Sequence, residues 1–392
     1  MIGVRSGHRV EAIGRDRIVS ERRSAKAPIR HFDLMLLLSV AGLSVIGALA
    51  VYATTRARQE QFGEDPALFL KRHIVYLAAA FFVFLGLLFF DYRQLRGFSL
   101  VLYGGVVLML LIVLTPIGTQ VAGAQRWIDL GVFQIQPAEL AKMALIVMLA
   151  ALYTQDRPEM TPDAKVLIGV GLTALLAVVI FVQPDLGTLM VLPAILFSVL
   201  LISGTRLRWL LALLMAGVVI FFLILNLGLI RDYQIDRLRA FMDPESDSQR
   251  AGYNLQQSLF AVGSGGLNGK GLFEGTQTNL DFVPEQHTDF VFTAIGEEGG
   301  FIGGLVVLGL FALLLWRALR IAMLSKDLFG TLLAAGIAGM LAFQVFVNVG
   351  MTIGLMPITG IPLPFLSYGG SSLIVNFSAV AVLMNIHMRR FV

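Results

Sequence analysis

A polar stretch runs directly into a long apolar one at residues 283–292, VPEQHTDFVF, and Asp289 stands at the junction. A carboxylate at the mouth of a membrane helix is costly to keep, so it marks a candidate functional site. It can act as a general base when a substrate hydroxyl comes within hydrogen-bond distance. Glu285 and His287 are its nearest candidates for tuning. The alternative is that Asp289 only caps the helix that follows, for which its position is equally suitable.

Two basic side chains lie just before and just inside another apolar segment. They are Arg126 in RWIDLG (126–131) and Lys142 in QIQPAELAK (134–142). Glu139 and Lys142 are three residues apart and share a helix face, so an ion pair that neutralises both is one interpretation. The other is that Lys142 and Arg126 contact an anionic headgroup and stabilise charge growing on a phosphate leaving group. Acids and cations gathered on one face of a membrane suit acid–base chemistry on a phosphate-bearing substrate.

Two further polar segments lie between apolar runs. In QPDLGT (183–188), Gln183 and Asp185 flank Pro184, and a helical hairpin with Asp185 as its cap is the simpler interpretation. IPLPFLSYGGSS (361–372) predicts an irregular loop, whose serines either line a cavity or cap a helix. Irregular backbone at membrane depth is tolerated where protein or water covers it, which favours a polar cavity. The serines are Ser367, Ser371 and Ser372.

Two other features receive a structural interpretation. Glu297 and Glu298 would lie within a membrane helix and point into the bundle, beside glycines that favour close helix packing. GSGGLNGKG (263–271) lacks the spacing of a phosphate-binding loop, so we expect a flexible cluster of turns.

The composition is that of a polytopic membrane protein. Of 392 residues, 57% are hydrophobic and 14% are charged, whereas soluble domains have roughly a quarter of their residues charged. The chain has no cysteine, which excludes disulfides, thiolate metal sites and cysteine nucleophiles. A net charge of +4 fits a membrane surface better than nucleic acid, because the basic residues cluster by topology.

Apolar windows of bilayer-spanning length predict an all-α fold of ten transmembrane helices. We expect residues 1–33 to form a polar cytoplasmic N-terminal tail, 34–392 the membrane domain, and 231–288 a long extracytoplasmic loop between helices seven and eight. That loop should carry short surface helices, one of them amphipathic near 254–262 and lying at the membrane interface. The predicted spans are 34–53, 73–90, 98–116, 137–153, 165–182, 186–202, 209–230, 289–316, 328–355 and 373–388.

Basic residues in the flanks predict the orientation. With the N-terminus inside, nineteen Lys and Arg fall on the inner side and eleven on the outer side. The positive-inside rule therefore places both termini in the cytoplasm and Asp289 on the outside. No cleavable signal peptide is recognised in the first 30 residues.

Four motifs in order, RWIDLG…QPAELAK, QPDLGT, VPEQHTDF…GEEGG and GIPLPFLSYGGSS, resemble the SEDS family of bacterial cell-wall proteins (shape, elongation, division, sporulation). The resemblance covers almost the whole chain beyond the tail, and is closer to the RodA branch than to FtsW. It implies a ten-helix peptidoglycan glycosyltransferase that polymerises lipid II for cell elongation and shape, at the outer face of the bacterial cytoplasmic (inner) membrane. The growing lipid-linked strand would be the donor, and the 4-hydroxyl of the lipid II GlcNAc would be the acceptor.

The resemblance also assigns roles to residues. The family's essential aspartate falls on Asp289, the expected general base, and its lysine falls on Lys142. Its Arg-Trp pair matches Arg126 and Trp127, whereas a position that is often basic is Gln134 here, which leaves room for a divalent cation, Mg or Mn. No protein ligand for a metal is identified. The expected substrate-binding residues are Arg126, Trp127, Glu139, Lys142, Gln183, Glu285, His287, Thr288, Ser367 and Ser371.

Proteins with this resemblance work with a class B penicillin-binding protein, a transpeptidase whose single helix docks on the bundle. The main alternative function is a flippase that transports lipid II, because transporters also carry intramembrane carboxylates and broken helices. Clustering of the charges at one face favours the enzyme. A non-catalytic scaffold would leave Asp289 without a role.

Overall fold

The computed structural model describes residues 31–121, 124–129, 131, 134–155, 159–227, 232–242, 251–280 and 282–390. The predicted tail therefore lies outside the described residues except for positions 31–33. There Asp33 caps the first membrane helix, because its Oδ1 accepts a hydrogen bond from Leu36 N at 3.1 Å.

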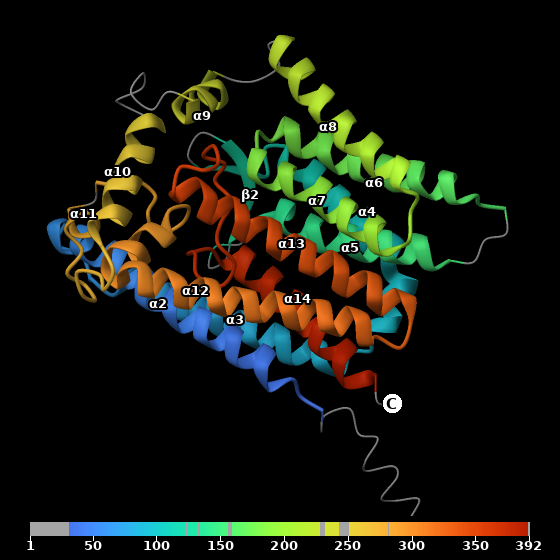
Figure 1. Ribbon diagram of the computed structural model, residues 1–392, viewed down its shortest axis with the longest axis horizontal. Helices are drawn as coiled ribbons and strands as arrows, with labels where there is room; N and C mark the ends of the chain where they lie inside the picture. Colours follow the sequence, from blue (N-terminus) through green and yellow to red (C-terminus); the bar gives the residue numbers. More distant parts are fainter. Residues whose placement is uncertain are drawn as a thin grey trace, which may run out of the picture.

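Within these residues, ten long helices form one bundle (Figure 1), and each overlaps one of the ten predicted spans. Eight of them are long and apolar enough to cross a membrane, and α7 and α8 are shorter apolar helices. Predicted and observed ends differ by up to eight residues; the eighth span runs from Val291 to Leu324 instead of from 289 to 316. The ten are α2 (Leu34–Gln61), α3 (Leu68–Phe89), α4 (Leu95–Val113), α5 (Pro137–Thr154), α6 (Pro162–Val182), α7 (Leu186–Ile202), α8 (Leu207–Asn226), α12 (Val291–Leu324), α13 (Leu328–Thr352) and α14 (Gly370–Arg389).

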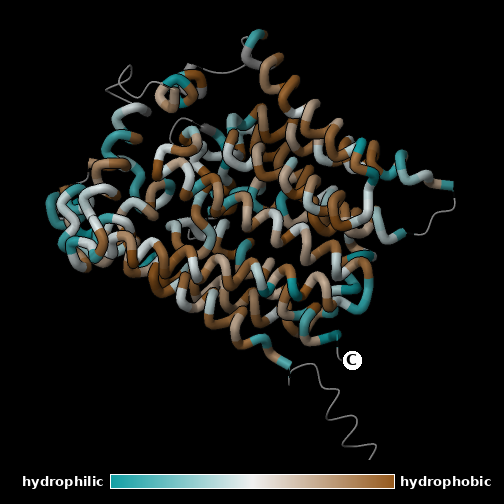
Figure 2. The backbone as a smooth tube through the Cα atoms, viewed as in Figure 1, coloured by the Kyte–Doolittle hydropathy of each residue, from teal (hydrophilic) through white to brown (hydrophobic). Residues whose placement is uncertain are grey.

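The bundle is apolar on its outside as well as in its core. Helices α13 and α14 lie centrally and are mostly buried, whereas α3 presents side chains such as Phe82 to the surroundings. Figure 2 shows the hydrophobic residues along the middle of the bundle and the hydrophilic ones toward its two ends. A contiguous apolar surface of this extent is unfavourable in water and marks a membrane protein.

A three-stranded antiparallel sheet lies between α4 and α5, which the sequence did not predict. Its strands are β1 (Gly118–Val121), β2 (Ala124–Asp129) and β3 (Gln134–Ile135), in the order β1-β2-β3. In its register Ile128 faces Ile135, so the sheet joins RWIDLG to the start of α5. Strands of two to six residues are too short for their alternation to be recognised. The fold is thus helical with one small sheet.

The long connection between α8 and α12 contains α9 (Asp232–Met242), α10 (Ala251–Ser264) and α11 (Thr276–Asn279), which confirms the predicted short helices. The amphipathic segment belongs to α10, which packs on the membrane helices; its position at the membrane interface stays a prediction. Ser258 Oγ donates to Thr352 O of α13 at 2.8 Å and lies 3.0 Å from Thr293 Oγ1 of α12. Buried polar contacts therefore fix α10 on the bundle.

Helix α12 breaks at Gly300, where φ is 63° and ψ is −160°. The glycine-rich segment 263–271 enters this break and replaces the hydrogen bonds that the helix loses, which disagrees with the expected flexible turns. A Cβ at Gly269 would lie 2.0 Å from Glu298 O, so only glycine permits this approach. The replacement bonds run from Lys270 N to Glu297 O, Gly271 N to Glu298 O, Phe301 N to Gly266 O, and Ile302 N to Leu267 O.

Glu297 has a structural role, as expected, but its side chain contacts the loop around α11 and not the interior of the bundle. Its carboxylate accepts bonds from Gln277 N and Thr278 N at 2.9 Å and pairs with Lys270 Nζ at 2.7 Å. Because α12 breaks after it, Glu297 anchors α11 and the preceding loop and does not point into the bundle. The expected small-residue packing face is also wrong, since Gly300 forms the break and a Cβ at Gly299 would meet nothing within 4 Å.

Candidate active site

A cavity of about 630 Å³ opens where a strand, several helices and two loops meet. Its walls come from β2, the first turns of α5 and α7, α9, and the loops that precede α12 and α14. The irregular loop before α14 therefore does border a polar cavity, as predicted. Seven predicted site residues line it: Arg126, Trp127, Glu139, Lys142, Glu285, Thr288 and Asp289.

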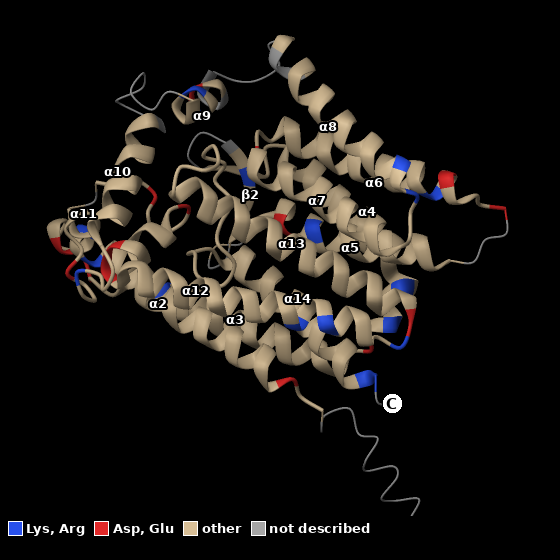
Figure 3. Ribbon diagram, in the orientation of Figure 1, with Lys and Arg blue, Asp and Glu red and all other residues tan. Residues whose placement is uncertain are grey.

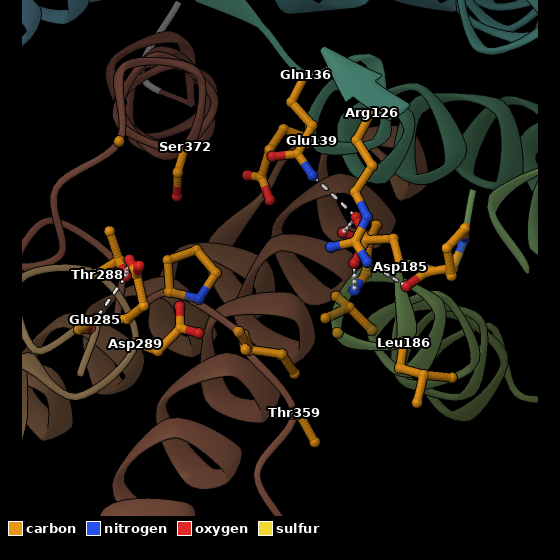
Figure 4. Close-up of a pocket in the computed structure, with 18 of the residues that line it drawn as sticks. Arg126, Gln136, Glu139, Asp185, Leu186, Glu285, Thr288, Asp289, Thr359 and Ser372 are labelled. Atoms are coloured by element: carbon orange, nitrogen blue, oxygen red, sulfur yellow. Dashed lines mark hydrogen bonds between the residues drawn. The ribbon is translucent and has the colours of Figure 1, made fainter. Parts of the chain in front are cut away.

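Asp289 faces this cavity and does not cap α12. The N-cap position is Phe290, and no side chain makes a capping bond there. The backbone holds the residue in place, because Asp289 N donates to Glu285 O at 3.0 Å and Asn348 Nδ2 donates to Asp289 O at 2.8 Å. Figure 4 shows Asp289, Glu285 and Thr288 on one side of the cavity and Arg126 and Asp185 on the other. The interpretation of Asp289 as a helix cap is wrong.

The electrostatic surroundings suit Asp289 to proton transfer. Burial raises its pKa to about 6; Arg237 opposes this increase, and the carboxylates of Glu285 and Asp185 add to it. A general base works best with a pKa near the working pH. Asp289 is therefore mostly ionised at neutral pH and more basic than an exposed aspartate.

The cavity lining also contains Lys142 in an ion pair, as one of the two interpretations predicted. Lys142 Nζ lies 2.8 Å from Glu139 Oε1, and both side chains are almost completely buried. Glu139 Oε2 has no hydrogen-bond partner among the residues that the structure describes. A buried acceptor without a partner beside a cavity is unfavourable unless a ligand supplies a donor or a cation.

Arg126 forms hydrogen bonds to the backbone of the turn between α6 and α7. Its Nε donates to Gln183 O at 3.0 Å, and its Nη2 donates to Pro184 O. Asp185 caps α7 as predicted, accepting from Thr188 N at 3.1 Å, and it also receives Gln136 Nε2 at 2.9 Å. Because Asp185 also lines the cavity, it belongs to the site, from which the sequence argument omitted it.

Four predicted binding residues lie behind the lining. Each makes contacts that shape the walls, and their binding roles stay predictions. Gln183 Nε2 donates to Leu110 O, Ser367 Oγ accepts from Leu363 N, Ser371 Oγ donates to Gln134 O and accepts from Gln136 N, and the His287 ring packs against Phe69 and Tyr368.

Sequence reasoning missed Arg237, Gly360 and Tyr368. Arg237 is one basic residue in an alternately charged segment of α9, and nothing in its local pattern connects it with Asp289. A signal existed for Gly360 and Tyr368, which both lie in the motif GIPLPFLSYGGSS with the predicted cavity serines.

The donor set does not form a metal cage by itself. In the part of the chain that the structure describes, no three His, Asp or Glu side chains converge on one point. Magnesium is commonly bound by one or two carboxylates together with substrate phosphates. The free oxygen of Glu139 fits that mode of binding.

The chain is similar to curated proteins along nearly its whole length. It is 38% identical over 365 residues to "Probable peptidoglycan glycosyltransferase FtsW" of Trichlorobacter lovleyi, covering 91% of this chain and 93% of that protein. It is 37% identical over 362 residues to "Peptidoglycan glycosyltransferase MrdB" of Escherichia coli, covering 92% and 94%. "Stage V sporulation protein E" of Bacillus subtilis is 36% identical over 356 residues, covering 90% and 96%. These nearly equal identities do not select the RodA or the FtsW branch.

Solved structures agree with this relationship. A chain from the work described as "Structural coordination of polymerization and crosslinking by a peptidoglycan synthase complex" matches with a TM-score of 0.76 at 33% identity, covering 92% of this chain and 98% of that chain. The crystal structure of Thermus thermophilus rod shape determining protein RodA matches with a TM-score of 0.67 at 32% identity, covering 92% and 97%. The family model for FtsW, RodA and SpoVE, described as cell cycle proteins, matches residues 33–391. The chain therefore belongs to the FtsW/RodA/SpoVE family, the SEDS family that its motifs resemble.

Proposed function

We propose that this membrane protein is a peptidoglycan glycosyltransferase that polymerises lipid II into glycan strands, with Asp289 as its general base. Relatives that match over more than 90% of this chain bear the name peptidoglycan glycosyltransferase. The observation that carries the assignment of the base is that the Asp289 carboxylate faces a cavity of about 630 Å³ that Arg126 and Lys142 also line.

In the proposed reaction, the acceptor is the 4-hydroxyl of the lipid II GlcNAc. Asp289 accepts the hydroxyl proton while the oxygen attacks the anomeric carbon of the lipid-linked strand, with inversion of configuration. The bond from that carbon to the pyrophosphate breaks, and undecaprenyl pyrophosphate leaves. Arg126 and Lys142 oppose the negative charge that grows on this leaving group.

The charge of the cavity supports participation of a divalent cation. Three cations and four carboxylates line it, so it carries one net negative charge when all are ionised. A pyrophosphate would enter such a cavity more readily with Mg²⁺ or Mn²⁺, which would neutralise charge on the phosphates. Glu139, with its free Oε2, is the residue that would contact the ion.

We also propose that the cavity opens at the outer face of the cytoplasmic membrane and that both termini are cytoplasmic. Asp33 at the start of α2 pairs with Arg317, and it lies 3.8 Å from His387 near the end of α14. The two ends of the described chain therefore meet at one end of the bundle (Figure 1). Lys and Arg gather at that same end in Figure 3, as the positive-inside rule requires of a cytoplasmic face.

The proposed partner is a class B penicillin-binding protein. A similar chain comes from a peptidoglycan synthase complex that coordinates polymerisation with crosslinking. A single transmembrane helix of such a transpeptidase would dock on the apolar outside of the bundle.

The test is polymerisation of labelled lipid II by the purified protein with its cognate transpeptidase, whose activity is blocked by a β-lactam. Wild-type protein should make glycan strands, and Asp289→Asn should make none while it retains its fold. The matched control is Asp163→Asn at the other end of the bundle, where Asp163 pairs with Arg208, and this variant should polymerise normally. Undiminished synthesis by Asp289→Asn would exclude Asp289 as the base.

The same preparation tests the alternative, a lipid II flippase. In proteoliposomes, a flippase would move labelled lipid II across the bilayer without making strands.

Lys142→Ala should lose more polymerisation activity at low than at high divalent cation concentration if Lys142 opposes pyrophosphate charge. An equal loss at both concentrations would count against that role.

A further inference from the structure

Gly360 lies at the point where α9 meets the carboxylate of Asp289. A Cβ at Gly360 would lie 3.2 Å from Asp289 Oδ2 and 3.6 Å from Arg237 Nη1. The backbone there has a φ of +74°, a conformation that glycine adopts without strain. Gly360 therefore leaves a notch in which the guanidinium and the carboxylate lie close to one another.

Helix α9 brings Arg237 to this notch from a segment more than fifty residues before Asp289. The helix packs against α10, and α10 is fixed to α12 and α13 through Ser258. The arginine is thus supported by elements that pack on the membrane helices, although its own helix is not one of the ten.

The other charged groups around the cavity act on Asp289 in different ways. Glu285 in its own loop and Asp185 at the start of α7 oppose its ionisation. On the far wall, β2 carries Arg126, which holds two carbonyl groups. The remaining charges, Glu139 and Lys142 of α5, neutralise each other in their buried pair. The positive charge that favours ionisation of Asp289 is that of Arg237, which lowers the aspartate pKa.

We propose that Arg237 is the positioning residue for Asp289: from α9 it orients the carboxylate over Gly360 and keeps it ionised in the resting enzyme. This inference rests on the proposed function of Asp289 as the base. Arginine stays protonated throughout, so the acceptor proton passes to Asp289 alone. Once Asp289 holds the proton, Arg237 favours its release, because the guanidinium stabilises the carboxylate that forms.

The test is the pH dependence of kcat/KM for lipid II polymerisation by the complex with its transpeptidase. In wild-type protein the rate should fall on the acid side of about pH 6, where Asp289 becomes protonated. Arg237→Gln should move this acid limb upward by about 1 pH unit, because an opposite charge nearby favours the ionised form. Arg237→Lys should restore most of the wild-type position.

Two glycines provide a matched pair of variants. Gly360 and Gly354 both have a φ of +74°, but a Cβ at Gly354 would approach only side-chain atoms of Leu259 and Leu255, at 3.4 Å or more. Gly360→Ala should lower kcat about tenfold or more and move the acid limb upward, since its methyl group displaces Arg237 from Asp289. Gly354→Ala has the same backbone strain and should leave the acid limb in place.

The outcomes separate this inference from the proposed function. If Arg237→Gln lowers the rate by the same factor at every pH, Arg237 does not control the ionisation of Asp289 and the inference is overturned. Asp289→Asn would still be inactive in that case, so the assignment of the base would stand. If Asp289→Asn is active, both proposals fail.

Discussion

Lys142 Nζ lies 2.8 Å from Glu139 Oε1 inside α5, with 1% and 4% of the two side chains exposed. This pair lines the same cavity as Asp289 and places a compensated charge within a membrane helix. Its burial makes it sensitive to the loss of either partner.

Removing one partner of this pair should destabilise the protein strongly. Glu139→Ala leaves a buried ammonium without its counter-charge, which costs about 3–5 kcal/mol of the free energy of unfolding. Thermal unfolding in detergent measures the loss. The double variant Glu139→Gln with Lys142→Met should recover much of the stability without recovering polymerisation. A double variant as unstable as Glu139→Ala would contradict this explanation.

Asp289→Asn should stabilise the protein in a pH-dependent manner. Because the folded-state pKa of Asp289 is raised to about 6, the folded protein binds a proton more tightly than the unfolded chain. The wild-type carboxyl group therefore favours folding at pH 4 and below, and this contribution is lost as the pH rises through 6. At pH 8 the neutral amide should be more stable than wild type by on the order of 2 kcal/mol. Unfolding temperatures of both proteins at pH 5 and pH 8 measure the difference, which should be larger at pH 8.

The break in α12 should tolerate no side chain at Gly300. A Cβ there would lie 2.2 Å from Gly269 N, so Gly300→Ala should reduce the free energy of unfolding by about 2 kcal/mol or more. The neighbouring variant Gly299→Ala is the control, because a Cβ at that position meets nothing within 4 Å. Equal unfolding temperatures for the two variants would show that the glycine-rich segment does not enter the break as described.

Orientation can be measured because the chain contains no cysteine. Glu64→Cys, in the exposed connection between α2 and α3, should react with a membrane-impermeant maleimide added outside the cytoplasmic membrane. Lys326→Cys, in the exposed connection between α12 and α13, should react only after that membrane is permeabilised. The reverse labelling pattern would place the cavity on the cytoplasmic side.

The ten spans and the motif residues around the cavity were predictable from the sequence. A membrane helix requires about 20 mainly apolar residues, and this requirement is local, so each window could be recognised by itself. The same is true of the Asp185 cap and of the ion pair between Glu139 and Lys142, whose spacing on one helix determines that they meet.

Contacts between segments that are far apart in the sequence were determined only by the tertiary structure. It made Asp289 a group that faces the cavity instead of a helix cap, and it brought Arg237 beside it over Gly360. It also turned 263–271 from a flexible turn cluster into the segment that fills the break at Gly300. These arrangements follow from close backbone contacts and charges that only packing brings together. The sequence therefore determined which residues enter the membrane and which types are available for chemistry, whereas packing determined which of them act on one another.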